Sequence, residues 1–552
     1  MAERTYQADV VIAGAGLAGI VTAYELLDHG KSVVLLDKDV PEKLGGLAKE
    51  SFGGVHMIDT PLQRRSGIRD SPELAWKDWQ ECAHFGPGDR WPRAWARLYC
   101  ERSAAYIWDF LAQKRVTFLP IVNWVERGLF RPLNTVPRWH VTWGTGWEIV
   151  TRVLAALDAH PSRGKLQIHF GHEVNAIEMT GGRAVAFSGR TMSDGAPYTA
   201  RGEQLVVASG GICGGDLSKV RANWYAPWGE APRVLLNGAH DYGDGLLHDR
   251  VQALGGNLTH MDKQWHYPAG IHKPGGRRPD DGISLVPPRS ALWMNANGER
   301  IGPTPLVSYT DTRFLVEQIC KEPGQYSWQV LNRKIALKEL GVSGCDYMTA
   351  FRHKKKLLLA RQLLFGNREL VDRLVAECPD DVVVAGSLPE LVDRMNERSL
   401  HGCKVDLAAV EHHVREYDDQ IDRGPAYYND DQLRRITVYM SYRGDKVRTC
   451  NFQKILDPKA MPLMAIREFI LSRKSLGGIQ TDLEGRVLRP DGSPLDGLRA
   501  VGECAGFGGG GIHGLGSLEG TFLGGCVLTG RVTAQAIAGK TLRAPSNEGA
   551  HR

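Results

Sequence analysis

The chain of 552 residues is too long for one simple domain, so at least two domains are expected. Hydrophobic residues at 42% and charged residues at 24% are typical of a globular protein. The net charge of +5 is mild for this length, and the basic residues are spread along the chain, which argues against nucleic acid or an anionic membrane as a partner.

The ten cysteines form no C-x-x-C pair, haem-attachment motif or iron–sulfur spacing, so no built-in electron-transfer chain is predicted. Their low number favours free thiols in a reducing compartment. The first strand begins within nine residues of Met1, which leaves no room for a signal peptide, and no apolar run reaches the ~18 residues of a membrane span. We therefore expect a cytoplasmic protein with no transmembrane segment and no metal site.

The first predicted element is a buried strand over residues 9–13, which is followed by the turn G-A-G-L-A-G and a helix over residues 20–29. This turn matches the G-x-G-x-x-G fingerprint of dinucleotide-binding proteins. Gly14 permits the tight turn, Gly16 leaves room for a pyrophosphate, and Gly19 lets the helix pack closely on the strand. The pyrophosphate is expected at the helix N-terminus, where free N–H groups and the helix dipole favour an anion.

A second buried strand over residues 31–36 ends at Asp37, about 20 positions after Gly14, where an acid is needed for the adenosine ribose. The alternative is a glycine-rich loop in an unrelated α/β fold. A second glycine-rich loop over residues 44–54 suits a backbone that passes close to a flat, phosphorylated ligand, and a merely flexible loop is the alternative.

The middle of the chain predicts both helices and strands. Helices are expected over residues 70–118 and 147–157. Alternating segments at 165–170, 176–179 and 183–187 indicate an antiparallel meander. A buried strand that ends at Ala208, Ser209 and Gly210 is expected to rejoin the first sheet behind the ligand.

The texture of the sequence changes between residues 257 and 445, where loops rich in Pro, His and Arg precede helices such as 354–364 and 370–377. This segment is interpreted as an inserted second domain. The predicted division is therefore 1–256 for the first part of the ligand-binding domain, 257–445 for the inserted domain and 446–552 for the second part.

The last part of the chain contains a strand over residues 498–503, a glycine-rich stretch over 506–516 and an apolar helix over 518–538. The positive end of that helix points at whatever lies in front of it. A simple hinge at the glycine-rich stretch is the alternative.

The opening turn, the Gly45-Gly46 loop, the 208–211 segment, the 243–245 segment and the 498–503 strand stand in the order of a known superfamily. Over nearly the whole chain the sequence resembles the fumarate reductase/succinate dehydrogenase flavoproteins, and among them the FAD-binding dehydrogenases related to 3-ketosteroid Δ1-dehydrogenases. The resemblance implies an α/β fold, with a non-contiguous Rossmann-type, glutathione-reductase-like FAD-binding domain and an inserted α+β capping domain. The active site would lie between them.

The resemblance also implies which residues contact FAD. They are Gly14, Gly16, Leu17, Ala18, Gly19, Asp37, Lys38, Gly45, Gly46, Ser51, Gly53, Gly54, Val174, Ala208, Ser209, Gly210, Asp244, Gly502, Glu503, Ser517 and Leu518. Covalent attachment in this superfamily uses a histidine beside the second glycine-rich loop, where this chain has L-A-K-E-S at 47–51. Non-covalent FAD is therefore expected.

In the inserted domain, His266 within Q-W-H-Y-P resembles a substrate-contacting histidine. Arg313 resembles the arginine that donates a proton to the substrate carbon, and Arg289 an arginine of the proton relay. Val286 stands in place of the relay glutamate.

Both known substrate grips are altered. Lys474 and Ser517 replace the histidine and the arginine that hold a dicarboxylate, which argues against fumarate or succinate. In the P-F-Y-A segment of the ketosteroid enzymes, Met464 replaces the tyrosine and cannot donate a hydrogen bond. Lys474, Tyr267 or Tyr309 can polarise a carbonyl instead.

The chemistry that the resemblance implies is hydride transfer between a substrate C–H and flavin N5, with proton transfer at the adjacent carbon. The acid–base candidates are Arg313, Tyr309, Tyr267 and His266, each of which also has a structural interpretation. Three hypotheses follow. The first is a dehydrogenase that desaturates an apolar small-molecule ketone and passes electrons to an external acceptor. The second is an enone or enoate reductase fed by an external donor, and the third is a flavin-binding protein without turnover. A homo-oligomer stays open.

Overall fold

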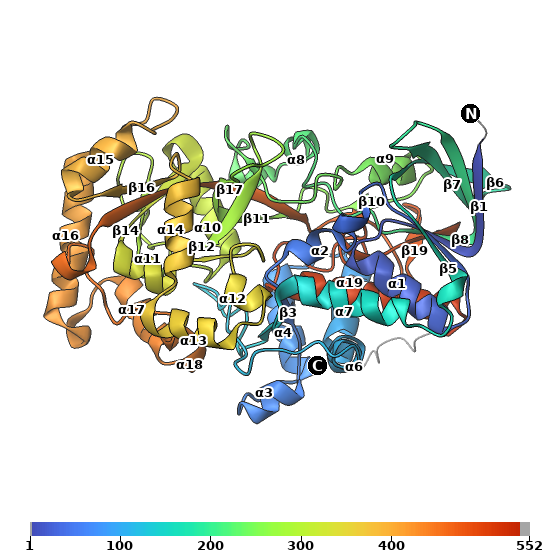
Figure 1. The fold of residues 1–552 in the computed structure, drawn as a ribbon, viewed down its shortest axis with the longest axis horizontal. Coiled ribbons are helices and arrows are strands. Elements are labelled where there is room, and N and C mark those ends of the chain that lie inside the picture. Colours follow the sequence, from blue (N-terminus) through green and yellow to red (C-terminus); the bar gives the residue numbers. More distant parts are fainter. Residues whose placement is uncertain (1–2, 541–552) are drawn as a thin grey trace.

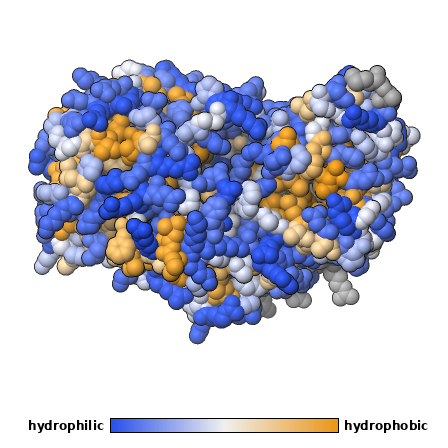
Figure 2. All heavy atoms as spheres, in the orientation of Figure 1, coloured by the Kyte–Doolittle hydropathy of each residue, from blue (hydrophilic) through white to orange (hydrophobic). Residues whose placement is uncertain are grey.

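The computed structural model describes residues 3–540, and the ends of the predicted domains at 1–2 and 541–552 lie outside these residues. Two eight-stranded sheets lie in opposite halves of an elongated molecule (Figure 1). Within residues 3–540, no helix is both long enough and apolar enough to cross a membrane. Hydrophilic side chains cover most of the face in Figure 2, and the hydrophobic ones on it form separate patches.

The first sheet has the strand order β19-β20-β8-β1-β2-β5, with β6 and β7 continuing from β8. Its strands are β1 (Arg4–Ala13), β2 (Val33–Leu36), β5 (Leu166–His169), β6 (His172–Thr180), β7 (Arg183–Thr191), β8 (Pro197–Val207), β19 (Arg486–Leu488) and β20 (Pro494–Ala500). β1 lies between β2 and β8 and is parallel to both. Strands at this position are buried on both faces, which explains the continuous apolar run from Val10 to Ala13.

The prediction that the strand before Ser209 rejoins the first sheet is confirmed by the pairing of β8 with β1. The meander prediction is wrong for residues 165–170, because β5 pairs in parallel with β2. The antiparallel meander consists of β6, β7 and β8. Alternation of apolar residues shows that a strand has one buried face, but it does not show which strand lies beside it.

Helices from both ends of the chain pack together beside this sheet, and α1 lies against α19. The helices of this half are α1 (Leu17–Asp28), α2 (Gly46–Glu50), α3 (Pro61–Arg65), α4 (Pro72–Ala83), α5 (Arg90–Arg102), α6 (Asp109–Gln113), α7 (Thr145–Asp158), α8 (Ser218–Ala222), α9 (Leu246–Ala253) and α19 (Thr521–Ile537). Two-stranded pairings of β3 (Gly54–His56) with β4 (Trp139–Val141), and of β10 (Leu258–Thr259) with β18 (Gly478–Ile479), complete it.

The second sheet is built around one long strand, β17 (Leu463–Ser475), which extends from the left half of Figure 1 to its centre. The strand order is β13-β14-β17-β11-β12-β15, and β9 and β16 also pair with β17. The other strands are β9 (Leu236–Asn237), β11 (Gln264–His272), β12 (Gly282–Val286), β13 (Leu292–Asn295), β14 (Tyr326–Asn332), β15 (Gly341–Val342) and β16 (Val382–Ala385). The sheet thus includes β17 from beyond residue 445.

The helices of this half are α10 (Thr312–Lys321), α11 (Arg333–Glu339), α12 (Thr349–Arg352), α13 (Lys356–Phe365), α14 (Arg368–Glu377), α15 (Leu388–Asn396), α16 (Leu407–Arg423), α17 (Asp431–Met440) and α18 (Arg443–Lys446). α14 buries Leu370, Val371 and Leu374 in the core. α13 buries none of its side chains.

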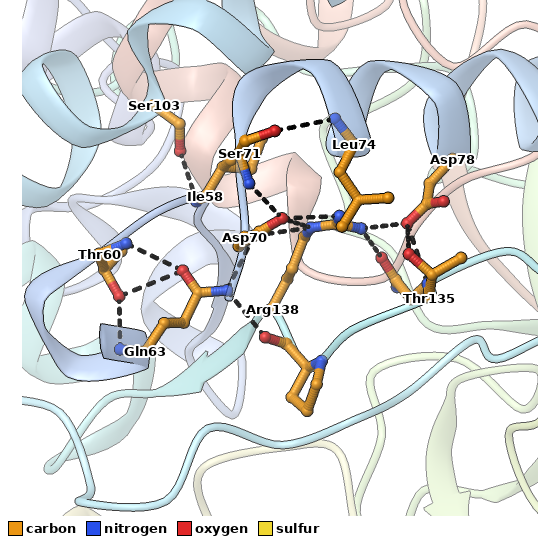
Figure 3. A network of polar contacts seen from close by, with 12 residues as sticks. Ile58, Thr60, Gln63, Asp70, Ser71, Leu74, Asp78, Ser103, Thr135 and Arg138 are labelled. Carbon is orange, nitrogen blue, oxygen red and sulfur yellow. Dashed lines mark hydrogen bonds and ion pairs between the residues drawn. The ribbon is translucent and has the colours of Figure 1, made fainter. Parts of the chain in front are cut away.

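A buried ion-pair network holds the segment before β4 against α4 (Figure 3). Arg138 Nη2 lies 2.8 Å from Asp70 Oδ1, and its Nη1 lies 2.5 Å from Asp78 Oδ2. Asp78 also accepts from the backbone N–H of Thr135 at 2.9 Å. The residue after Arg138 is Trp139, whose position in β4 therefore depends on this network.

Replacing Arg138 by leucine is expected to lower the free energy of unfolding by about 3–5 kcal/mol, because two buried carboxylates lose their counter-ion. Urea denaturation of the purified variant measures this loss. Arg64→Leu is the matched control, since Arg64 makes a comparable pair with Asp59 on the exposed surface. Equal stability of the two variants would contradict the importance of the network.

Candidate functional site

A cleft with about 1160 Å³ of empty space lies at the carboxyl ends of β1, β2 and β8. It is lined by fourteen of the residues that the sequence places at FAD. These are Gly14, Gly16, Leu17, Ala18, Asp37, Lys38, Gly45, Gly46, Val174, Ala208, Ser209, Gly210, Asp244 and Glu503. We call this cavity the dinucleotide cleft.

Two glycines shape the floor of the dinucleotide cleft. Gly14 has φ = +114°, and a Cβ there would lie 2.3 Å from the carbonyl oxygen of Ala208. Gly16 caps α1, and a Cβ there would meet no atom within 4 Å. The helix N-terminus thus faces open space at the one position where a side chain would fill it. This is the geometry that an anionic pyrophosphate requires.

Asp37, which follows β2, forms the opposite wall of the dinucleotide cleft. Its Oδ2 accepts from Ala15 N–H at 2.6 Å, and its Oδ1 accepts from Asp39 N–H at 2.8 Å. Burial raises the pKa of Asp37, while these two backbone bonds oppose the shift. The carboxyl group is therefore fixed beside the glycine turn, where ribose hydroxyls need an acceptor.

A second cavity, with about 700 Å³ of empty space, continues from the first through Leu47, Ala48, Glu503 and Cys526, which line both. Its walls include Phe52, Trp139, Phe507, Phe522 and Leu523. Three further predicted FAD residues line this second cavity. They are Ser51, Gly53 and Gly54. We call this second space the aromatic cavity.

Three polar side chains from distant segments meet in the aromatic cavity. Lys474 Nζ, on β17, donates to Tyr267 Oη, on β11, at 2.7 Å. Tyr267 O–H donates in turn to Glu519 Oε2 at 2.9 Å, and Trp265 Nε1–H donates to the same oxygen at 3.1 Å. Lys474 Nζ lies 3.8 Å from Glu519 Oε1. These contacts define the Tyr267–Lys474–Glu519 cluster.

Burial sets the protonation states in this cluster. It lowers the pKa of Lys474 to about 8, against the opposing pull of Glu519. Burial raises the pKa of Tyr267 well above its ordinary value, and Glu519 adds to the shift. Nearby, burial raises the pKa of Glu503 to about 7. At neutral pH the cavity therefore holds a neutral phenol as donor and an ammonium group that titrates within reach of physiological pH.

Two other predicted catalytic residues pack behind the cluster and do not line either cavity. Tyr309 lies with its ring 5.6 Å from that of Tyr267, and its O–H donates to the Leu285 carbonyl at 2.6 Å. The His266 ring stacks on Trp224 at 5.0 Å, and burial lowers its pKa to about 3. His266 is therefore neutral at any ordinary pH.

The two predicted arginines also lie outside the lining of both cavities. Arg313 Nη1 donates to the Leu515 carbonyl at 3.1 Å, and its guanidinium lies over the Tyr225 ring at 4.5 Å. Arg289 Nη2 pairs with Asp445 Oδ1 at 2.6 Å. Each guanidinium thus has structural partners of its own.

The remaining predicted FAD residues are Gly19, Gly502, Ser517 and Leu518, which line neither cavity. Ser517 is fully buried, with its Oγ 2.9 Å from Thr521 Oγ1. It supports the loop behind the aromatic cavity.

Sequence reasoning missed Glu519. A signal was present, because Glu519 is the sole acidic residue between positions 504 and 540, in a stretch otherwise made of glycines and apolar residues. An unpaired acid in such a loop is costly to bury unless it has partners or a function. The structure supplies those partners from β11 and β17.

Comparisons with known proteins identify what this arrangement is similar to. A family model described as FAD binding domain matches residues 9–523. A KsdD-like steroid dehydrogenase of Mycobacterium tuberculosis is 39% identical over 554 residues, covering 96% of each chain. Among solved structures, 3-ketosteroid Δ1-dehydrogenase of Sterolibacterium denitrificans has a TM-score of 0.71 at 14% identity, covering 97% of this chain and all of its own. A flavocytochrome c3 fumarate reductase has a TM-score of 0.67 at 18% identity, covering 98% of this chain and 79% of its own.

Proposed function

The chain belongs to the FAD binding domain family, and we propose that this FAD-dependent oxidoreductase desaturates a C–C bond next to the carbonyl of a ketosteroid. The observation that carries the proposal is the Tyr267–Lys474–Glu519 cluster. It lies in an aromatic cavity that continues from the dinucleotide cleft.

The residues present fit FAD. The open space at Gly16 accepts a pyrophosphate, and the fixed carboxyl group of Asp37 accepts hydrogen bonds from ribose. Glu503, which lines both cavities, is placed to meet the polar chain between the nucleotide and the ring. We propose non-covalent binding, since residues 47–51 offer no histidine for attachment.

The proposed domain division follows the two sheets. A Rossmann-type domain consists of residues 1–256 and the C-terminal part of the chain, and the capping domain begins at residue 257. We move its end from 445 to 475, because β17 pairs with four strands of the second sheet. With this boundary, Tyr267 and Lys474 belong to the cap and Glu519 to the FAD domain, so the cluster forms where the two meet.

When bound, FAD supplies a two-electron acceptor for the hydride that leaves the β-carbon of the substrate. Lys474 and Tyr267 donate hydrogen bonds to the ketone oxygen, which acidifies the α-carbon. The α C–H bond breaks and its proton passes to the Glu519 carboxylate, while the electron pair forms the C=C bond. Two hydrogens thus leave the substrate, one as proton and one as hydride.

The walls favour an apolar, ring-shaped substrate over a dicarboxylate. Phe52, Trp139 and Phe522 present flat apolar surfaces to the aromatic cavity. Arg473 also lines it, but its guanidinium donates to the Gly238 carbonyl and so lacks the freedom of a carboxylate fork. The KsdD-like relative and the ketosteroid enzyme of similar fold support a steroid as the substrate class.

Anaerobic mixing of the holoenzyme with a panel of 3-ketosteroids tests this function. We expect the oxidised flavin absorbance to disappear with at least one ketosteroid and to persist with succinate. Reoxidation of the reduced enzyme by an enone, without reduction by any saturated ketone, would instead establish the reductase direction.

Replacing Lys474 by methionine is expected to slow flavin reduction by about 10²-fold, because one donor to the ketone oxygen is lost. The lowered pKa of Lys474 means that its ammonium form disappears as pH rises through about 8. The wild-type reduction rate should therefore fall above pH 8. A stopped-flow pH profile checks both points, and an unchanged alkaline limb in the variant would contradict the assignment.

A further inference from the structure

Helix α13 presents an exposed apolar face next to a cluster of positive charges. The exposed fractions of Leu357, Leu364 and Phe365 are 88%, 75% and 72%. Residues 357 and 364 are seven apart and lie on one side of the helix, near Arg361. No residue of α13 is buried, so the whole helix lies on the surface of the protein. Large exposed apolar side chains grouped in this way mark an interaction surface.

The surrounding sequence is strongly basic. Residues 347–368 contain six lysines and arginines and no aspartate or glutamate. Lys354 is paired with Glu148, but within residues 3–540 the structure shows no ion pair for Lys355, Lys356 or Arg361. The overall charge of +5 hides this local concentration, which is why the sequence argued against an anionic membrane.

A tryptophan on α7 extends the same surface. Trp147 is 37% exposed, with Lys49 Nζ 4.5 Å and Arg352 Cζ 4.4 Å from its ring centre. Arg352 ends α12, three residues before α13 begins to turn. An exposed indole between two cations is typical of residues that lie at the membrane–water interface.

From these observations, we propose that α13 docks this enzyme on an anionic lipid bilayer. Leu357, Leu364 and Phe365 would enter the acyl boundary, while Lys355, Lys356 and Arg361 contact the phosphates of the headgroups. Apolar side chains beside unpaired cations complement such a surface in both parts of its chemistry. Figure 2 shows hydrophobic side chains gathered in the lower left of the view, where Figure 1 places α13.

The docking helix lies close to the aromatic cavity. Phe351 of α12 contacts Phe52 with ring centres 5.0 Å apart, and Phe52 lies 6.0 Å from Trp139. Phe52 and Trp139 line the aromatic cavity. If the proposed function holds, an apolar steroid dissolved in the bilayer would reach the cavity over a short aromatic path. The docking itself does not depend on that reaction.

Sedimentation of the holoenzyme with vesicles tests the proposal. The probe is phosphatidylcholine mixed with phosphatidylglycerol, compared with phosphatidylcholine alone. We expect binding to the mixed vesicles that weakens as salt rises, and at least tenfold weaker binding by L357S/F365S and by K355E/K356E. The control F130S/M192S replaces two exposed apolar residues elsewhere and should bind like the wild type.

Retained flavin absorbance shows that each variant is folded, and none of these positions lines either cavity. Wild-type protein that stays in the supernatant with the mixed vesicles would overturn the proposal, as would equal binding by L357S/F365S. A dimer that dissociates in L357S/F365S, without vesicle binding by the wild type, would identify the face as a contact between two copies of the chain.

Discussion

Replacing Glu519 by glutamine is expected to slow reduction of bound FAD by a ketosteroid by about 10²–10⁴-fold, the usual contribution of a positioned base. Glutamine keeps the shape of the side chain and one acceptor oxygen for Tyr267 and Trp265, so the cavity stays intact. It cannot take up the α-proton. Anaerobic stopped-flow mixing measures the rate directly.

The matched control for this substitution is Glu317→Gln, which changes an exposed glutamate on α10 that pairs only with Lys321 among the described residues. Its rate of flavin reduction should equal that of the wild type. A second comparison is Glu519→Asp, which keeps the carboxylate and should retain more activity than the glutamine variant. Wild-type rates in Glu519→Gln would exclude Glu519 as the base.

Replacing Gly16 by leucine is expected to yield a folded protein that retains no FAD after purification. Gly16 has φ = −68°, a value that any residue adopts, and the space beyond it is free of protein atoms. The leucine side chain would therefore occupy the position of the pyrophosphate without disturbing the fold. The ratio of flavin to protein absorbance measures the loss.

Gly164→Leu is the matched control, because a Cβ at this exposed glycine also meets no atom within 4 Å. It should bind FAD like the wild type. Loss of FAD should also lower the Tm of Gly16→Leu to that of the apoprotein, since the ligand stabilises only the folded state. A yellow Gly16→Leu protein with full flavin content would contradict the placement of the cofactor.

The first half of the fold could be predicted because its signals are local. The strand–turn–helix around Gly14 and Gly16, and the strand that ends at Asp37, each occupy a short window with a distinct pattern. The FAD prediction is confirmed by the family match over residues 9–523. The helix over 147–157 likewise agrees closely with α7.

The second sheet could not be delimited in the same way. β17 is buried along nearly its whole length, so its sequence shows no alternation that would indicate a sheet or a partner. Its neighbours β11 and β14 lie more than a hundred residues earlier in the chain. Such pairings are set by tertiary packing, which a pattern in one short window does not contain.

The candidate site shows the same limit. Tyr267 and Lys474 could be singled out from family motifs, but their link to Glu519 arises only when three distant segments converge. Arg313 matched a motif as well, yet the fold surrounds its guanidinium with Tyr225, Trp228 and the Leu515 carbonyl. A motif identifies a residue type at a position, whereas its partners decide its chemistry.

The most direct test of this account is mass analysis of the product from one anaerobic turnover of the holoenzyme with a 3-ketosteroid. We predict a product lighter by two hydrogens, with a new double bond conjugated to the ketone, formed in an amount equal to the FAD reduced. Unchanged steroid, with FAD still oxidised across the panel, would contradict the proposed desaturation.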